Sequence, residues 1–476
     1  MNEHVSHVLV GETNVMRTNA GFPCPDCASV FKDAKGFSRH ILKQHNLKCK
    51  PIADPKSSRF TVQESPILST SASSDSIADS FTDTDTDTFT DTNISTDTVG
   101  SSSVYSFEFP PPAANDRFIF MNMDISECFH NFQLAVKAKI NQDPMSLTLE
   151  EHVQHILALS GILLLKPART HADLHQHIDL DICDRLLDHI LTSHLITRRH
   201  VFPSDIKDSV GEIVKRIVDL EPLDLPTYTE PYTRMYASRE IMKLMEGVTL
   251  SQTNRILLVI RNMVECLPRH IIGDGPQEIE LVTRNLQSVL VPLFEDIDAG
   301  IIFRWTSVSD DEKGITTRPD ASINIVRGAS LGQRLGCGEV KPQYQALNHK
   351  AIAKDLIRVG HLAKDASDKY QTRMIFGFVV VGNHGTFYVL HRTQEHLYLM
   401  CEIEHVQLPV VLGEIPLFLA QLDKVMNIVA GFAQAARREH HTYDHHPFTL
   451  ADHKLLAIID PKTSRKRKSI TSHYTH

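Results

Sequence analysis

Several features that would assign this chain to a common class of protein are missing from its sequence. It contains no glycine-rich loop that ends in Lys-Ser or Lys-Thr, so a P-loop phosphate site is not predicted. The longest apolar run, residues 156–165, is too short to span a bilayer and includes Ser160 and Gly161. The chain opens without an apolar stretch of the secretory type. We therefore expect a soluble intracellular protein with no membrane partner.

Cysteine and net positive charge are also scarce. The 476 residues include 8 cysteines, most of them isolated, which argues against a disulfide framework and favours a reducing compartment. The formal net charge is -9, so charge alone does not indicate a nucleic-acid-binding protein. Hydrophobic residues make up 42% of the chain and charged residues 22%, as in ordinary globular proteins. Because a chain of this length exceeds one hydrophobic core, we expect two or more folded units.

The most specific pattern present is F-P-C-P-D-C-A-S-V-F-K-D-A-K-G-F-S-R-H-I-L-K-Q-H at residues 22–45. Its spacing resembles a single C₂H₂-type zinc finger, which implies a ββα unit over residues 20–50. Two thiolates and two imidazoles complete a tetrahedron around Zn²⁺, and bound zinc supplies the folding energy that so small a core lacks. The implied zinc ligands are Cys24, Cys27, His40 and His45. The apolar core of the finger is matched by Phe22, Phe31 and Phe37.

The partner of this finger is open between nucleic acid and protein. In the register of the family, Asp33, Gly36 and Arg39 take the positions that read bases, and Gly36 has no side chain to do so. Basic residues that favour phosphate contacts are Lys32, Lys35, Arg39 and Lys43. One finger reads about three base pairs, which is too few for specificity on its own. Weak contact with DNA or RNA and docking to a protein are therefore both retained.

Residues 51–115 have the composition of a disordered acidic linker. They are rich in Ser, Thr and Asp, with the near-repeat T-D-T-D-T-D-T-F-T-D-T at 82–92. Such a segment buries too little apolar surface to fold by itself. It would tether the finger, or act as an acidic interaction or activation segment with three aromatic anchors. These anchors are Phe81, Phe89 and Phe107.

Residues 117–270 show the periodicity of helices. The predicted helices cover residues 147–165, 174–196, 203–220 and 238–267. Two His and Asp pairs, His175/His177 and Asp179/Asp181, are interpreted as solvated helix faces because no complementary ligand spacing follows them. The region would form either a layer on the sheet of the following region or a separate substrate-positioning domain.

Residues 318–341 place two acids and a lysine on two predicted strands. The segment reads R-P-D-A-S-I-N-I-V-R-G and, after a short loop, C-G-E-V-K. Side chains alternate along a strand, so Glu339 and Lys341 share a face. If the neighbouring strand brings Asp320 alongside, two carboxylates and an ammonium converge. Two carboxylates suit Mg²⁺ or Mn²⁺, and the lysine would orient or deprotonate a water, or stabilise charge on a phosphate.

This stretch resembles the PD-(D/E)xK nuclease superfamily through Pro319, Asp320, Glu339 and Lys341. The resemblance implies the order helix, three strands, helix, strand over about residues 270–410, and an acid on the first helix. Residues 277–294 would form that helix, with Glu278 as the acid and with Glu280 paired to Arg284. Residues 345–370 would form the second helix, and two strands would follow in 374–390. The implied activity is that of a magnesium-dependent endonuclease; a surface hairpin with incidental charges, or a family fold without activity, are the alternatives.

The C-terminal part adds an apolar helix and a basic tail. We expect a helix over residues 416–436 and an exposed loop at the paired histidines 440–441 and 445–446. The tail, 441–476, carries a basic run at 462–468 that is typical of nuclear import signals or phosphate contacts. The expected architecture is a zinc finger, a disordered linker, a helical region and, over 271–440, an α/β restriction-endonuclease-like domain with a mixed central sheet. The expected protein is nuclear (otherwise cytoplasmic), associates with DNA or RNA, and is either a metal-dependent phosphodiesterase or a non-catalytic zinc-finger regulator.

Overall fold

The fold comes from a computed structural model, which describes residues 107–143, 146–195, 200–219, 233–306, 319–394 and 396–437 and five short strands before residue 53. The chain divides into two compact units, Met1–Thr96 and Asp97–His476, and each is described by itself.

The first unit contains two small antiparallel sheets. One has the strand order β2-β1-β5, formed by β1 (His7–Val10), β2 (Thr13–Met16) and β5 (Cys49–Ile52). The other pairs β3 (Phe22–Pro23) with β4 (Val30–Phe31), so that Phe22 lies opposite Phe31. Strand β5 extends to Ile52, so the first two residues of the predicted linker, 51 and 52, belong to this sheet.

Only part of the predicted zinc finger lies within the described residues. Cys24 follows β3 directly and is buried. Seven other predicted site residues lie outside the described residues, namely Cys27, His40, His45, Lys32, Lys35, Arg39 and Lys43. The zinc site and the nucleic-acid contacts of the finger therefore stay predictions.

The second unit is built on a seven-stranded mixed sheet with the order β8-β14-β13-β12-β11-β10-β9. The strands are β8 (Ile162–Leu165), β9 (Ile301–Trp305), β10 (Ala321–Arg327), β11 (Ser330–Lys341), β12 (Met374–Val381), β13 (His384–Gln394) and β14 (Leu397–Gln407). The pairs β11–β12 and β14–β8 are parallel, and the other neighbours are antiparallel. The expected mixed α/β architecture is thus present in the C-terminal part of the chain.

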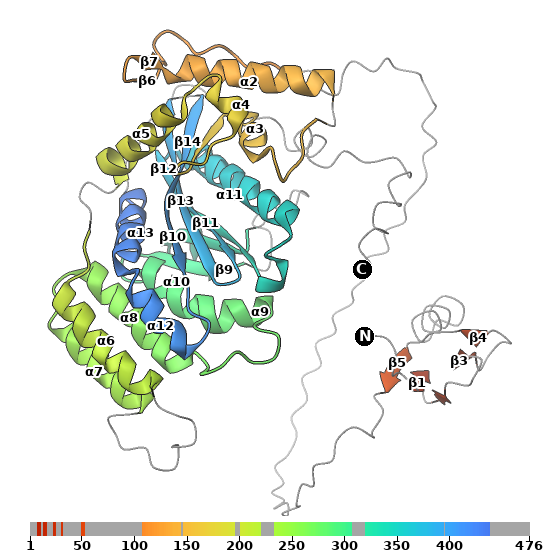
Figure 1. Ribbon diagram of the computed structural model, residues 1–476, viewed down its shortest axis with the longest axis vertical. Helices are drawn as coiled ribbons and strands as arrows, with labels where there is room; N and C mark the ends of the chain where they lie inside the picture. The colour runs from red at the N-terminus through yellow and green to blue at the C-terminus, as the bar shows by residue number, and fades with distance from the viewer. Residues whose placement is uncertain are drawn as a thin grey trace, which may run out of the picture. The chain divides into compact units, whose positions relative to one another are not determined.

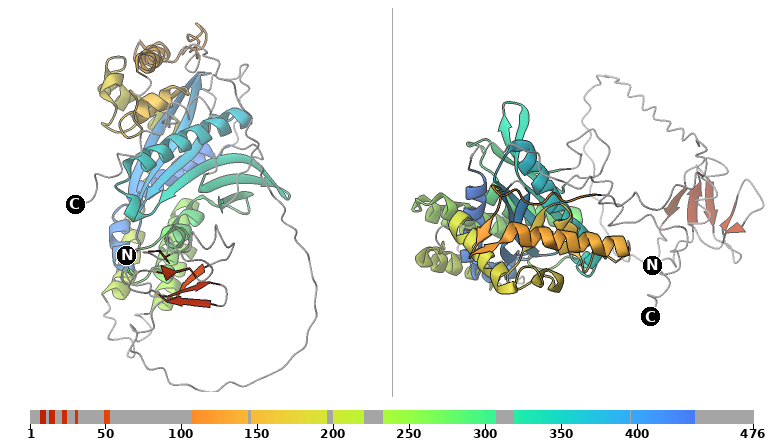
Figure 2. Two further views of the ribbon diagram at one scale, coloured as in Figure 1. Left: turned by 90° about the vertical axis from the view of Figure 1, so that its right-hand side faces the viewer. Right: turned by 90° about the horizontal axis from the view of Figure 1, so that it is seen from above.

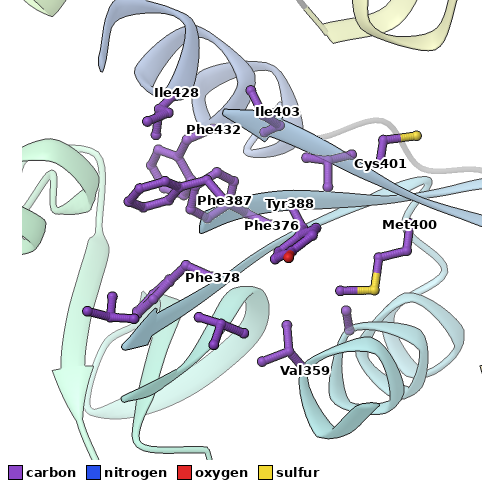
Figure 3. Close-up of a cluster of buried hydrophobic side chains, with 14 of the residues drawn as sticks. Val359, Phe376, Phe378, Phe387, Tyr388, Met400, Cys401, Ile403, Ile428 and Phe432 are labelled. Carbon is purple, nitrogen blue, oxygen red and sulfur yellow. The ribbon is translucent and has the colours of Figure 1, made fainter. Parts of the chain in front are cut away.

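Helices cover both faces of this sheet (Figure 1; Figure 2). Helix α11 (His349–Tyr370) packs on one face, where the thiol of Cys337 donates to the carbonyl of Val359 at 3.8 Å. Helices α10 (Gln287–Phe294) and α13 (Leu422–Ala435) pack on the other face. There the ring centroid of Phe376 lies 4.9 Å from that of Phe294 and 5.4 Å from that of Phe432. Figure 3 shows Phe376 and Phe432 within this apolar cluster. Since both faces are covered, β12 is an almost continuous apolar run rather than an alternating one.

The remaining helices of the second unit surround this core. They are α2 (Ile125–Gln142), α3 (Val153–Ala158), α4 (Ala172–His175), α5 (Leu180–Ile190), α6 (Ser204–Val218), α7 (Arg234–Glu246), α8 (Ser251–Cys266), α9 (Glu278–Glu280) and α12 (Ile415–Leu419). A small hairpin of β6 (Ile119–Phe120) and β7 (Met123–Asp124) precedes α2.

The helix predicted over residues 147–165 is present only as the short helix α3, with a turn before it and a strand after it. The short helix α3 ends before Gly161, which has a φ of +77° and so takes the left-handed conformation that terminates helices. The next four residues form β8, all of them buried, and pair in parallel with β14. A short apolar run that is buried on both sides has no periodicity to distinguish strand from helix. Residues 117–270 therefore belong to the same unit as the sheet and contribute one of its edge strands.

Other predicted boundaries also shift. The predicted linker extends too far, because Phe107 and Phe109 are buried in the core of the second unit, with ring centroids 5.4 Å apart. The helix predicted over 238–267 is two helices, α7 and α8, separated at Gly247. The helix predicted over 277–294 contains a π-helical segment, Leu281–Leu286, between α9 and α10.

The apolar segment predicted as one helix over 416–436 consists of α12 and α13. Among the described residues no single helix is long and apolar enough to cross a membrane; the stretch Leu412–Leu419 passes that test only together with Leu422–Ala435, at a bend of 75°. At the bend, the side chain of Gln421 accepts from the backbone N–H of Gln407 at 3.0 Å, which ties the break to β14. Helix α13 buries most of its apolar residues against the sheet.

Candidate metal and phosphodiester site

The antiparallel pair β10–β11 brings the two predicted acids to the same level of the sheet. Ala321 lies opposite Gly338, so Asp320 and Glu339 occupy the next pair of opposite positions. The Oδ2 of Asp320 accepts from the backbone N–H of Val340 at 2.8 Å. This bond fixes one oxygen of Asp320 against β11, beside Glu339 and Lys341, and leaves its other carboxylate oxygen for a further partner.

Glu339 and Lys341 face helix α11, which supplies two charged partners. The Nζ of Lys341 lies 2.8 Å from Oδ2 of Asp355. Nη1 of Arg358 donates to Oε2 of Glu339 at 2.9 Å and lies 3.6 Å from Oδ1 of Asp355. Three carboxylates and two cations therefore meet between the end of β11 and the first half of α11.

Burial dominates the electrostatics of Glu339. The side chain is 0% exposed, and its desolvation raises the pKa to about 9; the nearby charge of Asp320 adds to this shift and Arg358 opposes it. The Oε1 atom of Glu339 is buried and has no hydrogen-bond partner in the described part of the chain. Without a further cation, Glu339 therefore holds a proton at neutral pH. A divalent ion at Oε1 would restore its charge and satisfy that oxygen.

Lys341 remains an ammonium under the same conditions. Burial by itself lowers the pKa of Lys341, but the hydrogen bond and charge of Asp355, together with the other two acids, outweigh burial and raise it. Burial likewise raises the pKa of Asp355, against the opposing effect of Lys341. A lysine that stays charged orients a ligand or stabilises negative charge, and it does not serve as a general base at neutral pH. Of the roles considered for Lys341, the geometry favours these two.

Glu278 is not brought to this site. It is the first residue of α9 and is exposed, and no hydrogen bond or ion pair joins it to Asp320, Glu339 or Lys341, all of which are described residues. The neighbouring pair is as predicted, with Oε1 of Glu280 at 3.5 Å from Nε of Arg284.

Sequence reasoning missed two residues of the site, Asp355 and Arg358. They lie three positions apart in the predicted second helix and so share a face. That face is otherwise apolar, with the buried residues Val359 and Leu362 beside them. The sequence signal that could have revealed them is a pair of charged residues on the apolar side of a helix, which packs against the sheet. A second missed cluster is formed by His152, His155 and His171.

Comparisons of the chain with protein-family models, with curated proteins and with solved structures found no match. Function is therefore inferred from the geometry of these residues.

Proposed function

We propose that the unit Asp97–His476 is a divalent-metal-dependent phosphodiesterase that acts on nucleic acid. Asp320 and Glu339 would hold Mg²⁺ or Mn²⁺, and Lys341 would orient the attacking water and stabilise charge on the phosphate. The observation that carries the proposal is the buried Oε1 of Glu339, which has no hydrogen-bond partner among the described residues and lies close enough to Asp320 for the two charges to interact.

The order of elements supports this proposal. The segment runs through a helix (α9 to α10), the strands β9, β10 and β11, the helix α11 and the strand β12. This is the order of helix, three strands, helix and strand that the resemblance to PD-(D/E)xK nucleases implies. The first three strands form an antiparallel meander, and β12 lies parallel to β11.

The chemistry requires each residue to play a distinct part. A bound divalent ion would supply the positive charge that stabilises the extra negative charge on the phosphate during attack by water. Glu339 gives up its proton to become a ligand. Asp320 offers the oxygen that does not accept from Val340. Lys341, held by Asp355, presents its ammonium on the same face. Water adds to phosphorus as the bond to the leaving oxygen breaks; the attacking water loses a proton to solvent, and the leaving oxygen takes one up from solvent.

Arg358 favours a second candidate function, a nucleic-acid-binding or protein-docking regulator without catalysis. Its guanidinium lies 2.9 Å from Glu339 and already supplies part of the charge that a metal would bring. In this alternative the nuclease-like fold serves binding only, and the acids of the site are neutralised within the chain.

The rest of the chain is consistent with either function in a nuclear protein that associates with DNA or RNA. A zinc-bound finger at residues 20–50 would make weak contacts with nucleic acid or dock a protein, tethered by the acidic linker. The basic run at 462–468 would serve nuclear import. In such a chain the finger localises the protein and the second unit acts on the phosphodiester.

Nicking of supercoiled plasmid DNA and of single-stranded RNA tests the proposal. Full-length protein should cut at least one of these with Mg²⁺ or Mn²⁺ and not with EDTA. Asp320→Asn and Lys341→Met should each lower the rate by about 10²–10³-fold. The control is Glu212→Gln, which removes an exposed carboxylate on α6. Equal cutting by wild type and both site variants would remove the assignment, and failure of the wild type to cut with any divalent ion would favour the regulator.

A further inference from the structure

Three histidines from two short helices meet beside the edge strand β8. His152 is the N-cap of α3, His155 lies within α3, and His171 is the N-cap of α4. One ring nitrogen from each lies within 4.8 Å of those of the other two. The ring centroid of His155 is 4.9 Å from that of His152 and 4.4 Å from that of His171. Helices α3 and α4 lie together at the same end of the unit in Figure 1.

His155 has one nitrogen ready to bind a ligand. Its Nε2 lies 2.9 Å from Oδ2 of Asp173, so the proton of the neutral ring is on Nε2 and points to the carboxylate. The other nitrogen, Nδ1, is buried and has no hydrogen-bond partner among the residues that the structure describes. The side chain is 1% exposed. A buried lone pair without a donor is costly unless a metal or another group fills it.

Asp173 is the kind of partner that metal-binding histidines use. Its Oδ2 lies 2.9 Å from Nε2 of His155 and 3.2 Å from Nζ of Lys139. A carboxylate that accepts from the distal N–H of a histidine fixes the tautomer and orients the ring toward a metal.

His152 already faces a cation. The Nζ of Lys139 lies 3.2 Å from Nε2 of His152. The backbone N–H of Thr148 donates to Nδ1 of His152 at 3.1 Å, so ligation through Nε2 requires that bond to be given up and the proton to move to Nδ1, where the Thr148 hydroxyl at 3.3 Å can accept it. Lys139 thus stands where a metal would contact this nitrogen.

His171 must change one hydrogen bond to join the set. Its Nδ1 accepts from the backbone N–H of Asp173 at 3.0 Å and so caps α4. Ligation through Nε2 requires the proton to move to Nδ1 and that bond to be given up. Helix α4 spans only Ala172–His175, and the side chain of His171 is 27% exposed, so this change costs little packing.

We propose that His152, His155 and His171 form a transition-metal site of the zinc class, with Asp173 as the supporting carboxylate. Imidazole nitrogen suits Zn²⁺, and three protein ligands leave the fourth tetrahedral position to water. The bound ion displaces the ammonium of Lys139 and joins α3 to α4 across the segment that contains β8. This site is independent of the acids on β10 and β11.

The zinc content of the purified full-length protein tests the site, once the predicted zinc finger has been disabled by mutation. The parent variant carries Cys24→Ser and Cys27→Ser, and elemental analysis after dialysis should find about one zinc per chain. Adding His155→Phe should abolish this zinc. The matched control, His384→Gln, alters another neighbouring histidine pair, in which Nδ1 of His384 lies 3.3 Å from Nε2 of His405. It should leave the zinc content unchanged.

Two further variants keep the result clear if His155→Phe fails to fold. Asp173→Asn should weaken zinc affinity by about 10–100-fold. Lys139→Met should tighten it, because a competing cation is removed, and a misfolded chain cannot produce that outcome. Cobalt substitution in the parent should give d–d absorption without the charge-transfer bands of thiolate ligands. A parent that holds no zinc would overturn the site. So would normally folded His155→Phe and Asp173→Asn proteins that bind zinc as the parent does, or a Lys139→Met protein that binds zinc no more tightly.

Discussion

The guanidinium of Arg358 lies 2.9 Å from Oε2 of Glu339, the carboxylate that the sequence alone assigns to a divalent metal. One oxygen of this buried acid is therefore paired within the chain, while Oε1 has no hydrogen-bond partner among the described residues. The two proposed functions differ in which of these oxygens matters. In a nuclease, Oε1 of Glu339 receives a metal. In a regulator, the contact between Oε2 of Glu339 and Arg358 is sufficient.

Replacing Arg358 separates these two roles. Arg358→Gln removes the only cation that contacts Glu339 at hydrogen-bond distance among the described residues, and should lower the free energy of unfolding in EDTA by about 1–3 kcal/mol. Under the nuclease account, Mn²⁺ should then raise the melting temperature of the variant more than that of wild type, because the ion replaces the lost charge. Thermal unfolding with and without Mn²⁺ measures both effects. An identical response of the two proteins to Mn²⁺ would count against a metal at this site.

The buried proton of Glu339 predicts a pH dependence of stability without metal. The ordinary pKa is 4.5 and the folded pKa is raised to about 9 by burial and by Asp320. Between these values the unfolded chain has released the proton and the folded chain retains it, so the free energy of unfolding should fall as pH rises. Urea unfolding in EDTA from pH 5 to pH 9 should show a steeper fall for wild type than for Glu339→Gln. Asp355, whose pKa burial also raises, leaves part of the slope in the variant. Equal slopes would show that Glu339 is ionised in the folded protein.

Packing beneath the site sets the position of Glu339. A methyl group at Gly338 would overlap the ring of Phe378, which is fully buried. Gly338→Ala should therefore destabilise the protein by about 1–3 kcal/mol, as overpacked cores do. The control is Gly211→Ala on α6, where an added methyl meets nothing within 4 Å. This change should stabilise the helix by about 0.5–1 kcal/mol. Urea unfolding of both variants checks the pair, and a Gly338→Ala protein as stable as wild type would contradict this packing.

The central acids could be predicted from the sequence because their relationship is local. Period-two alternation puts Glu339 and Lys341 on one face, and a short loop between two strands suffices to bring Asp320 across. Asp355 and Arg358 required one more step, since which face of α11 meets β11 depends on tertiary packing. Glu278 shows the same limit, because helical periodicity gives the apolar stripe of a helix but not the direction in which its exposed residues point.

The histidine cluster lay beyond sequence reasoning for a different reason. His152 and His155 are three residues apart and visible as a helical pair, but His171 follows after β8. Only the pairing of β8 with β14 turns the chain so that α4 returns to α3. Because those four apolar residues are predicted as part of a helix, the sequence gives no indication that His171 lies beside His152 and His155. The histidines that sequence reasoning did consider, His175 and His177, are not part of the cluster.

Electron paramagnetic resonance of Mn²⁺ added to the full-length protein measures whether the buried oxygen of Glu339 receives a divalent ion. The account predicts a Mn²⁺ site in wild type and in the control Glu212→Gln, and affinity weaker by about tenfold or more in Glu339→Gln. Indistinguishable Mn²⁺ titrations for Glu339→Gln and Glu212→Gln would contradict it.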